Sequence, residues 1–303
     1  ADSGQRPTTI YEDPGARAII YAQSFEVIQD SPWIGAGYGN FENAWRRNHA
    51  QTANPSGNVV LGLQALNHPH NETLLWLVEG GLLAFSGLLI LALALLRSLW
   101  RVPWAKGLSL LALVTPILIH TQTEYPLYHS SLHWITLVLL LAMIDSACAP
   151  SHRTVFPKIV LPAALALAIP LAVIPFMITG LHSLAVITKF ESKKPQEFQL
   201  LMKVANPPFD LNRFHWHLWE LRLSTALITQ NEAELTAYLA WSEHLAQTMA
   251  RSPLFINQMI ALRALGRFEE AEAVLAEALY LFGDRPDLRP FVGMDSAVRI
   301  KLE

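Results

Sequence analysis

The stretch NHPHNETLLWLVEGG, from Asn67 to Gly81, places two histidines directly before a long apolar run. His68 and His70 flank Pro69, and the run carries Glu79 about two turns in. A neutral imidazole, whose ordinary pKa is about 6.5, can take a proton from a hydroxyl group. A carboxylate inside an apolar segment is costly unless it faces a polar cavity or a partner. The stretch therefore predicts a cavity that opens at the start of the run.

Further polar residues lie in segments that could face the same cavity. Arg17 falls in a helical pattern from about Gly15 to Gln29, and the segment SPWIGAGYGNF that follows carries glycines at alternate positions. These glycines follow a helix rather than a strand, so they predict a tight turn against the membrane surface and not a nucleotide-binding loop. Asn71 can cap the helix behind it. His120 and Glu124 are four residues apart and would share a helix face if their helix continued through them. The other candidates are Arg46, Arg47, Tyr125 and His129.

The composition indicates a membrane protein. Of 303 residues, 52% are hydrophobic and only 16% are charged, and the mean hydropathy is +0.27. Such a chain is too apolar for a soluble domain of this length. Each of four apolar runs is at or near the roughly 20 residues that cross a bilayer; the runs are Leu74–Leu96, Gly107–Ile119, Leu132–Ala149 and Ile159–Leu181. The sequence predicts an all-α fold, a polytopic membrane helical bundle with four spans.

The charges of the short links predict which ends of the spans face outward. The links after the first and third runs contain Arg97, Arg101, Lys106, Arg153 and Lys158. Residues 120–131, after the second run, contain no lysine or arginine. By the positive-inside rule, residues 67–73, 120–131 and the tail after the fourth run share the outer face. The chain opens ADSGQRPTT without a methionine, a signal peptide or a preceding span, so we expect it to be the C-terminal part of a longer polytopic protein.

Polar segments flank the spans on both sides. We expect residues 1–73 to form an outer loop segment with short helices, 74–189 the transmembrane region, and 190–303 a helical tail. Cys148 is the single cysteine, so no disulfide framework is expected. The chain lacks the basic stripe with interleaved aromatic residues that nucleic-acid binding requires.

The tail contains a pattern typical of a helix pair. Apolar residues at helical spacing run from Ile256 to Leu288, with an interruption at Gly266 and a stop at Gly283. Ala271 and Ala278 occupy positions where two such helices would cross. The pattern predicts a soluble, tetratricopeptide-like (TPR-like) helical domain, which would either dock a partner or pack as an appendage.

The order of these motifs resembles that of a known enzyme family. The sequence resembles the C-terminal half of the O-antigen ligase and polymerase superfamily. The motifs that carry the resemblance are, in chain order, an arginine-bearing helix, SPWIGAGYGNF, HPHNETLLWLVEGGLLAFSGLLIL and HTQTEYPLY. Within it, the bacterial protein O-oligosaccharyltransferases are the most similar. The resemblance covers residues 10–150, and the tail resembles the helical periplasmic extension of those enzymes.

The resemblance implies a membrane glycosyltransferase of the GT-C type in the bacterial inner membrane. Such enzymes transfer a glycan from undecaprenyl pyrophosphate to an acceptor hydroxyl on the periplasmic side. The resemblance assigns the essential histidine to His70 and the phosphate-binding arginine to Arg17. A histidine suits a general base, and an arginine suits the charge of a leaving pyrophosphate. We expect substrate binding by His68, Asn71, Glu79, Arg46, Arg47, Glu124 and Tyr125. A further arginine of the family lies in spans upstream of this sequence, so the site would be incomplete without them.

The residues leave the acceptor and the class of protein open. The resemblance favours a serine or threonine of a pilin-like protein; the lipid A core or a growing glycan are alternatives. No Asp-x-Asp cluster stands near the predicted outer surface, so we expect no metal and no cofactor besides the lipid-linked oligosaccharide donor. A zinc site of His68 and His70 with His120 or His129 is a rival interpretation. A non-catalytic transporter or scaffold subunit, with Asp145 as its best mid-span charge, is another.

Overall fold

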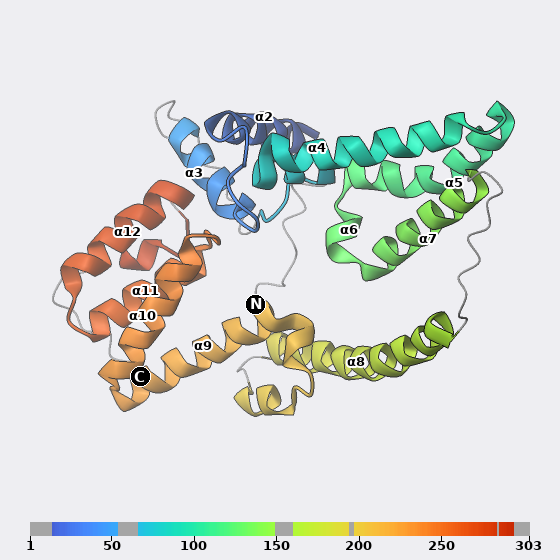
Figure 1. Cartoon of the computed structure of the whole chain (residues 1–303). Helices are drawn as coiled ribbons and strands as arrows, with labels where there is room; N and C mark the ends of the chain where they lie inside the picture. The colour runs from blue at the N-terminus through green and yellow to red at the C-terminus, as the bar shows by residue number, and fades with distance from the viewer. Residues whose placement is uncertain (1–13, 54–65, 149–159, 194–196, 284, 294–303) are drawn as a thin grey trace. The chain divides into compact units, whose positions relative to one another are not determined.

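The described part of the chain is helical throughout. The computed structural model describes residues 14–53, 66–148, 160–193, 197–283 and 285–293, and these ranges contain no strand (Figure 1). Residue contacts divide the chain into two compact units. Unit 1 comprises Ala1–His152, Trp241–Ile260 and Phe268–Val298, and unit 2 comprises Arg153–Ala240, Ala261–Arg267 and Arg299–Glu303. The predicted all-α membrane bundle is confirmed.

Among the residues described, four helices are long and apolar enough to cross a membrane. They are α4 (Glu72–Trp100), α5 (Trp104–Thr123) and α7 (Ser131–Cys148) in unit 1, and α8 (Val160–Ser192) in unit 2. The helix that contains the fourth predicted span continues past Leu181 to Ser192. Phe190 is fully buried in a core with Leu200 and Leu201. Burial of this side chain stabilises the part of the helix that follows the apolar run. The link that carries Arg153 and Lys158 lies outside the described residues.

The three spans of unit 1 pack against one another (Figure 1). Their shared core consists of Leu99, Val114, Ile117, Leu137, Ile144 and Cys148. Many other apolar side chains on these helices remain exposed, such as Ile90 at 67% and Leu139 at 64%. Extended exposed apolar surface on long helices marks contact with lipid. The bundle therefore belongs in a membrane.

Helix α4 is broken near its start, at Gly81. The sequence predicted one continuous span, but Gly81 has φ 62° and ψ −160°, which no helix residue adopts. The turn that follows α2 (Pro14–Asp30) fills the break. Four backbone hydrogen bonds of 2.8–3.1 Å join them, from Ala36 and Gly37 to the carbonyls of Val78 and Glu79, and from Leu82 and Leu83 to the carbonyls of Pro32 and Trp33. The break persists because the turn satisfies the groups that the helix leaves unpaired.

Two glycines allow the turn to approach this closely. A Cβ atom on Gly35 would lie 2.5 Å from the backbone carbon of Glu79, and one on Gly81 would lie 2.5 Å from that of Trp33. Gly35 also has φ 66°, in the left-handed region. The alternate glycines of SPWIGAGYGNF thus form a turn, as predicted, and its partner is the broken helix.

Helices α2 and α3 (Phe41–Ala53) pack against the first turns of α4. The core between them contains Ile20, Val27, Phe41, Trp45, Leu66, Leu75 and Val78. The indole nitrogen of Trp45 donates to the carbonyl of Ile20 at 3.3 Å. This packing fixes the face of α2 that carries Arg17 and Tyr21 against the segment that precedes α4.

The N-terminal half of α3 is also bound to residues that precede α11 (Ser252–Ala264). Arg251 donates to Glu42 with distances of 2.9 Å from Nε and 3.0 Å from Nη2. The Asn43 amide donates to the carbonyl of Gln247 at 2.6 Å. Residues 204 and 209 positions further along the chain therefore help to hold the helix that follows the glycine turn.

The helix pair predicted in the tail is present as α11 and α12 (Phe268–Phe282). Gly266, with φ 74°, lies between them, and Gly283, with φ 68°, ends α12. Ala271 and Ala278 are buried, as expected of small residues at a helix crossing. The interruption at Gly266 and the stop at Gly283 are thus confirmed, although the first helix begins at Ser252, before the predicted run. The TPR-like assignment and the domain boundaries stay predictions.

Unit 2 surrounds the end of α8 with short helical segments. These are η1 (Phe198–Lys203), η2 (Pro207–Asp210) and α9 (Leu211–Thr229), followed by most of α10 (Glu232–Ala246). Glu191 on α8 accepts from Arg213 at 2.9 Å and lies 2.7 Å from Nε2 of His217. Burial lowers the pKa of His217, but its hydrogen bonds to Glu220 and Glu191 outweigh burial and raise it overall. This charged cluster joins α8 to α9.

Candidate functional site

One carboxylate, that of Glu124, joins residues that the sequence analysis selected. Its Oε1 lies 3.3 Å from a guanidinium nitrogen of Arg17. Its Oε2 lies 3.0 Å from Nδ1 of His70 and 3.8 Å from Nε2 of His68. The ring of Tyr125 lies 3.4 Å, between centroids, from that of His68. These five predicted residues form one cluster in unit 1, which we call the Glu124 cluster.

Glu124 reaches the cluster because α5 ends directly before it. The residue is extended, with φ −150°, and the Arg17 guanidinium also donates to the carbonyl of Thr123 at 3.4 Å. Helix α5 therefore does not continue through Glu124, so the condition for a helix face shared by His120 and Glu124 is not met. Pro126 disfavours helical backbone at the residue before it, so the chain turns here into α6 (Pro126–His129).

The backbone of His70 adopts a conformation that is rare for residues other than glycine. Its φ is 54°, and its carbonyl accepts from the Tyr21 hydroxyl at 3.3 Å. The next residue, Asn71, caps α4 by accepting from the Leu74 amide at 2.9 Å, which confirms the predicted cap. The Asn71 amide group donates to the carbonyl of Gln122 at 3.2 Å. A strained residue that is fixed on both sides indicates a functional constraint.

The geometry around His70 is that of a histidine oriented by a carboxylate. Because a carboxylate only accepts hydrogen bonds, Nδ1 carries the proton that points at Glu124, and Nε2 of the neutral ring is left able to take another. The same carboxylate would stabilise the imidazolium that then forms. The Arg17 side chain is 36% exposed, so its guanidinium can still receive an anion. The Glu124 cluster can therefore deprotonate a hydroxyl beside an anionic leaving group.

Three residues of the cluster also satisfy the spacing of a metal site. Possible ligand atoms of His68, His70 and Glu124 lie within 4.8 Å of one another. Arg17 binds the same carboxylate, and its permanent charge opposes a second cation there. His120, a ligand in the zinc interpretation, instead packs its ring 5.3 Å from that of His133. The side chain of His129 lies outside the described part of the chain.

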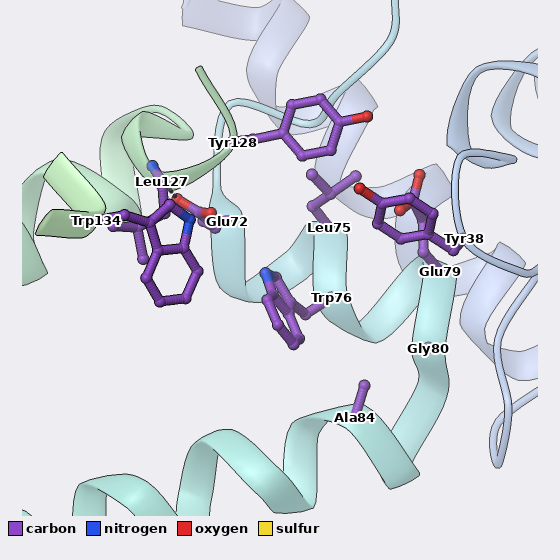
Figure 2. A pocket seen from close by; sticks show the side chains of 10 residues that line it. All are labelled: Tyr38, Glu72, Leu75, Trp76, Glu79, Gly80, Ala84, Leu127, Tyr128 and Trp134. Atoms are coloured by element: carbon purple, nitrogen blue, oxygen red, sulfur yellow. Dashed lines mark hydrogen bonds between the residues drawn. The ribbon is translucent and has the colours of Figure 1, made fainter. Parts of the chain in front are cut away.

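Glu79 lies at the break in α4 and belongs to a second feature. Its Oε1 accepts from the backbone amide of Phe41 at 3.3 Å. Its side chain lines a cavity together with Tyr38 and Tyr128 (Figure 2). The buried carboxylate thus has both the partner and the cavity that its place in an apolar run required.

Arg46 and Arg47 lie on α3 and contact α12 of the same unit, away from the Glu124 cluster. The guanidinium of Arg47 lies 2.6 Å from the carboxylate of Glu277. Arg46 is only 2% exposed, and its guanidinium lies 5.6 Å from the ring of Trp45 and 5.3 Å from that of Phe282. Burial lowers the pKa of Arg46 to about 10. Both arginines that were expected to bind substrate therefore join α3 to α12.

Three polar residues that support the site were not among those predicted from the sequence. Tyr21 lies one helical turn after Arg17, and this spacing could have identified it. The carbonyl of Gln122 accepts the hydrogen bond from the Asn71 amide group, and the Gln122 amide group donates to the Thr73 hydroxyl at 2.9 Å. Glu72 accepts from the Leu127 amide at 3.1 Å and thereby joins α4 to α6. Neither Gln122 nor Glu72 stands out in sequence, because polar residues are common at the ends of spans.

Comparison with known families matches two parts of the chain. Residues 108–290 match the family described as virulence factor membrane-bound polymerase, C-terminal. Residues 11–89 match the family described as O-antigen ligase. The first match includes Glu124, and the second includes Arg17 and His70, so the Glu124 cluster draws on both. No curated protein and no solved structure matches the chain.

Proposed function

Because the chain belongs to the O-antigen ligase and polymerase superfamily, we propose that it transfers a glycan from undecaprenyl pyrophosphate to an acceptor hydroxyl. The family matches support a membrane enzyme of the ligase and polymerase type. The observation that carries the proposal is the shared carboxylate of Glu124, which places a carboxylate-oriented histidine, His70, beside a partly exposed arginine, Arg17.

In the proposed reaction the acceptor oxygen attacks the anomeric carbon of the glycan. Nε2 of His70 takes the hydroxyl proton as the new carbon–oxygen bond forms. The bond between the anomeric carbon and the pyrophosphate oxygen breaks, and undecaprenyl pyrophosphate leaves as an anion. Arg17 holds the negative charge that develops on the leaving group, and Glu124 stabilises the imidazolium. Direct attack inverts the configuration at the anomeric carbon.

We propose a protein serine or threonine as the acceptor, because the motifs resemble those of protein O-oligosaccharyltransferases. The family match over residues 108–290 carries the description of a polymerase and supports a growing glycan as a second candidate. The lipid A core is the acceptor that the O-antigen ligase description supports. All three present a hydroxyl to the same base.

We place the site on the periplasmic face of the inner membrane, as the charges of the short links indicate. Ser130 lies next to α6, and Ser192 ends α8. Cysteines introduced at these positions of the full-length protein should react with a membrane-impermeant reagent in intact spheroplasts. Reaction only after permeabilisation would contradict this orientation.

The proposal is tested in a strain that lacks the gene and expresses either the wild-type protein or His70→Asn at equal abundance. Wild-type cells should consume the lipid-linked glycan and add it to one acceptor. Mass spectrometry of periplasmic proteins, analysis of lipid A core and measurement of glycan length identify which one. Equal consumption in the two strains would refute the proposed chemistry.

The same assay in proteoliposomes tests the zinc interpretation. We expect a chelator to leave the transfer rate unchanged, because the chemistry assigned to Arg17, His70 and Glu124 requires no metal. Complete inhibition by the chelator, reversed by zinc, would favour a metal site at His68, His70 and Glu124 instead.

A further inference from the structure

A cavity of about 530 Å³ lies in unit 1, between the first turns of α4, the glycine turn, α6 and the start of α7. Its volume falls within the roughly 300–1,000 Å³ of ligand pockets. It is lined by Tyr38, Glu72, Leu75, Trp76, Glu79, Gly80, Ala84, Leu127, Tyr128 and Trp134. Neither the family matches nor the proposed transfer reaction assigns it a role.

Four aromatic rings surround this cavity and leave much of their surface exposed. Figure 2 shows the rings of Trp76, Trp134, Tyr38 and Tyr128 around the open space. Their exposed fractions are 36%, 43%, 82% and 53%, and the centroids of the two tyrosine rings lie 6.4 Å apart. Aromatic surface that gathers around a cavity without being covered indicates a ligand with flat apolar faces.

Two buried carboxylates line the same cavity. In Figure 2, Glu72 lies at the end near Trp134, and Glu79 lies at the end near Tyr38. Glu72 accepts from the backbone amide of Leu127 and from the side chain of Trp76, and Glu79 accepts from the backbone amides of Phe41 and Gly39. These bonds fix the carboxylates and leave further acceptor capacity on each group. Burial and the nearby Tyr38 and Glu79 raise the pKa of Tyr128, so its hydroxyl keeps its proton and can donate.

This combination fits a sugar ring. The C–H faces of a pyranose stack on aromatic rings, and its hydroxyls donate to carboxylates and accept from tyrosine hydroxyls. An isoprenoid chain has no donors, so it would desolvate the two carboxylates and leave their remaining acceptor positions unsatisfied, which is costly. We propose that the cavity is a saccharide subsite, in which Trp76 and Trp134 stack on a pyranose ring while Glu72 and Glu79 accept from its hydroxyls.

The subsite lies close along the chain to the Glu124 cluster. Glu72 follows His70 by two residues, and Leu127 follows Glu124 by three. A sugar in the cavity would therefore belong to a glycan that takes part in the transfer, either as part of the lipid-linked donor or as part of a glycan acceptor. This role rests on the proposed function, whereas saccharide binding itself does not require transfer.

The test uses the full-length protein in nanodiscs and Trp76→Leu and Trp134→Leu variants, which remove a ring but keep an apolar side chain. Trp100→Leu is the matched control, because Trp100 ends α4, is 89% exposed and does not line the cavity. The probe is the oligosaccharide that mild acid releases from the cells' own lipid-linked glycan. Saturation-transfer NMR measures its binding, and undecaprenyl phosphate without sugar serves as the comparison lipid.

We expect saturable binding of the oligosaccharide to the wild type and to Trp100→Leu, and binding roughly five- to tenfold weaker in the two cavity variants. In the transfer assay those variants should raise KM by a similar factor with little change in kcat. A higher KM for the lipid-linked donor identifies a donor sugar, and a higher KM for the acceptor identifies an acceptor glycan. Immunoblots and size-exclusion profiles control for folding.

Three results would overturn the subsite. In the first, the oligosaccharide shows no saturable binding. In the second, undecaprenyl phosphate alone displaces the oligosaccharide. In the third, the cavity variants have the same affinity and KM as the Trp100→Leu control. The last result would mean that Trp76 and Trp134 are interfacial aromatic residues. If the wild type binds the oligosaccharide but transfers nothing, the proposed function fails and the subsite stands. If transfer proceeds unaltered in the cavity variants, the subsite fails and the function stands.

Discussion

Replacing Glu124 by glutamine isolates the contribution of one charge to catalysis. The substitution preserves the shape of the side chain that reaches Arg17 at 3.3 Å and His70 at 3.0 Å. An amide nitrogen that faces Nδ1 of His70 would donate to it and place the ring proton on Nε2. The ring would then be unable to take a proton from the acceptor, and its imidazolium form would lose the neighbouring negative charge.

The magnitude follows from the exposure and contacts of Glu124. Loss of the carboxylate that orients a catalytic histidine lowers kcat by up to about 10,000-fold in other enzymes. Glu124 is 32% exposed, so water screens part of its effect. We therefore expect kcat to fall about 100- to 1,000-fold, which corresponds to roughly 2.7–4 kcal/mol in activation free energy. KM for the donor should change by less than about tenfold, because Arg17 keeps its charge.

The assay is glycan transfer by full-length protein in proteoliposomes, normalised to protein amount. Glu243→Gln is the matched control, because Glu243 is exposed on α10 and makes no contact with the cluster. The double variant with His70→Asn should be no slower than His70→Asn alone, since both changes remove the same base. A Glu124→Gln enzyme within threefold of the wild type, or strictly additive losses in the double variant, would refute the reasoning.

Three other predictions concern neighbouring features. His70→Asn should abolish glycan transfer while the protein remains at normal abundance, because asparagine tolerates the φ of 54° but supplies no base. His68→Ala should retain measurable activity. The reverse outcome would move the base to His68. Gly81→Ala should sharply reduce membrane abundance, because its Cβ would meet the turn at 2.5 Å, while Gly87→Ala, with no atom within 4 Å of the added Cβ, should accumulate normally; equal immunoblot signals would contradict the role of the break. His49 is buried on α3, with its Nδ1 2.8 Å from Oε1 of Gln23. Burial lowers its pKa to about 4, against about 6.5 unfolded, so its contribution to stability is complete above pH 6.5 and is lost as the pH falls towards 4. The midpoint of thermal unfolding should fall over this pH interval, and less steeply in His49→Gln; parallel slopes would exclude His49 as the cause.

The sequence by itself determined the features that depend on local composition. The spans follow from apolar length, and the cap at Asn71 follows from a short polar side chain that can accept from an amide three residues on. The helix pair follows from apolar spacing between Gly266 and Gly283, whose positive φ angles end helices. Each of these signals acts within a few residues, so it can be recognised without the fold. The candidate residues Arg17, His70 and Glu124 were also found, because each lies in a sequence motif whose order along the chain resembles that of a known family.

Only the tertiary structure decided how those residues meet. Glu124 is 107 residues from Arg17 and 54 from His70, and nothing local indicates that one carboxylate serves both. The break in α4 is equally non-local, because a polar backbone in an apolar segment is stable only when another segment, here the glycine turn, satisfies its hydrogen bonds. The same holds for Arg46, whose sequence environment suggested substrate binding but whose guanidinium packs on Phe282 from the far end of the chain. Which residue a charged side chain contacts depends on packing between segments that are distant in sequence. The hydropathy and spacing of nearby residues carry no information about that contact.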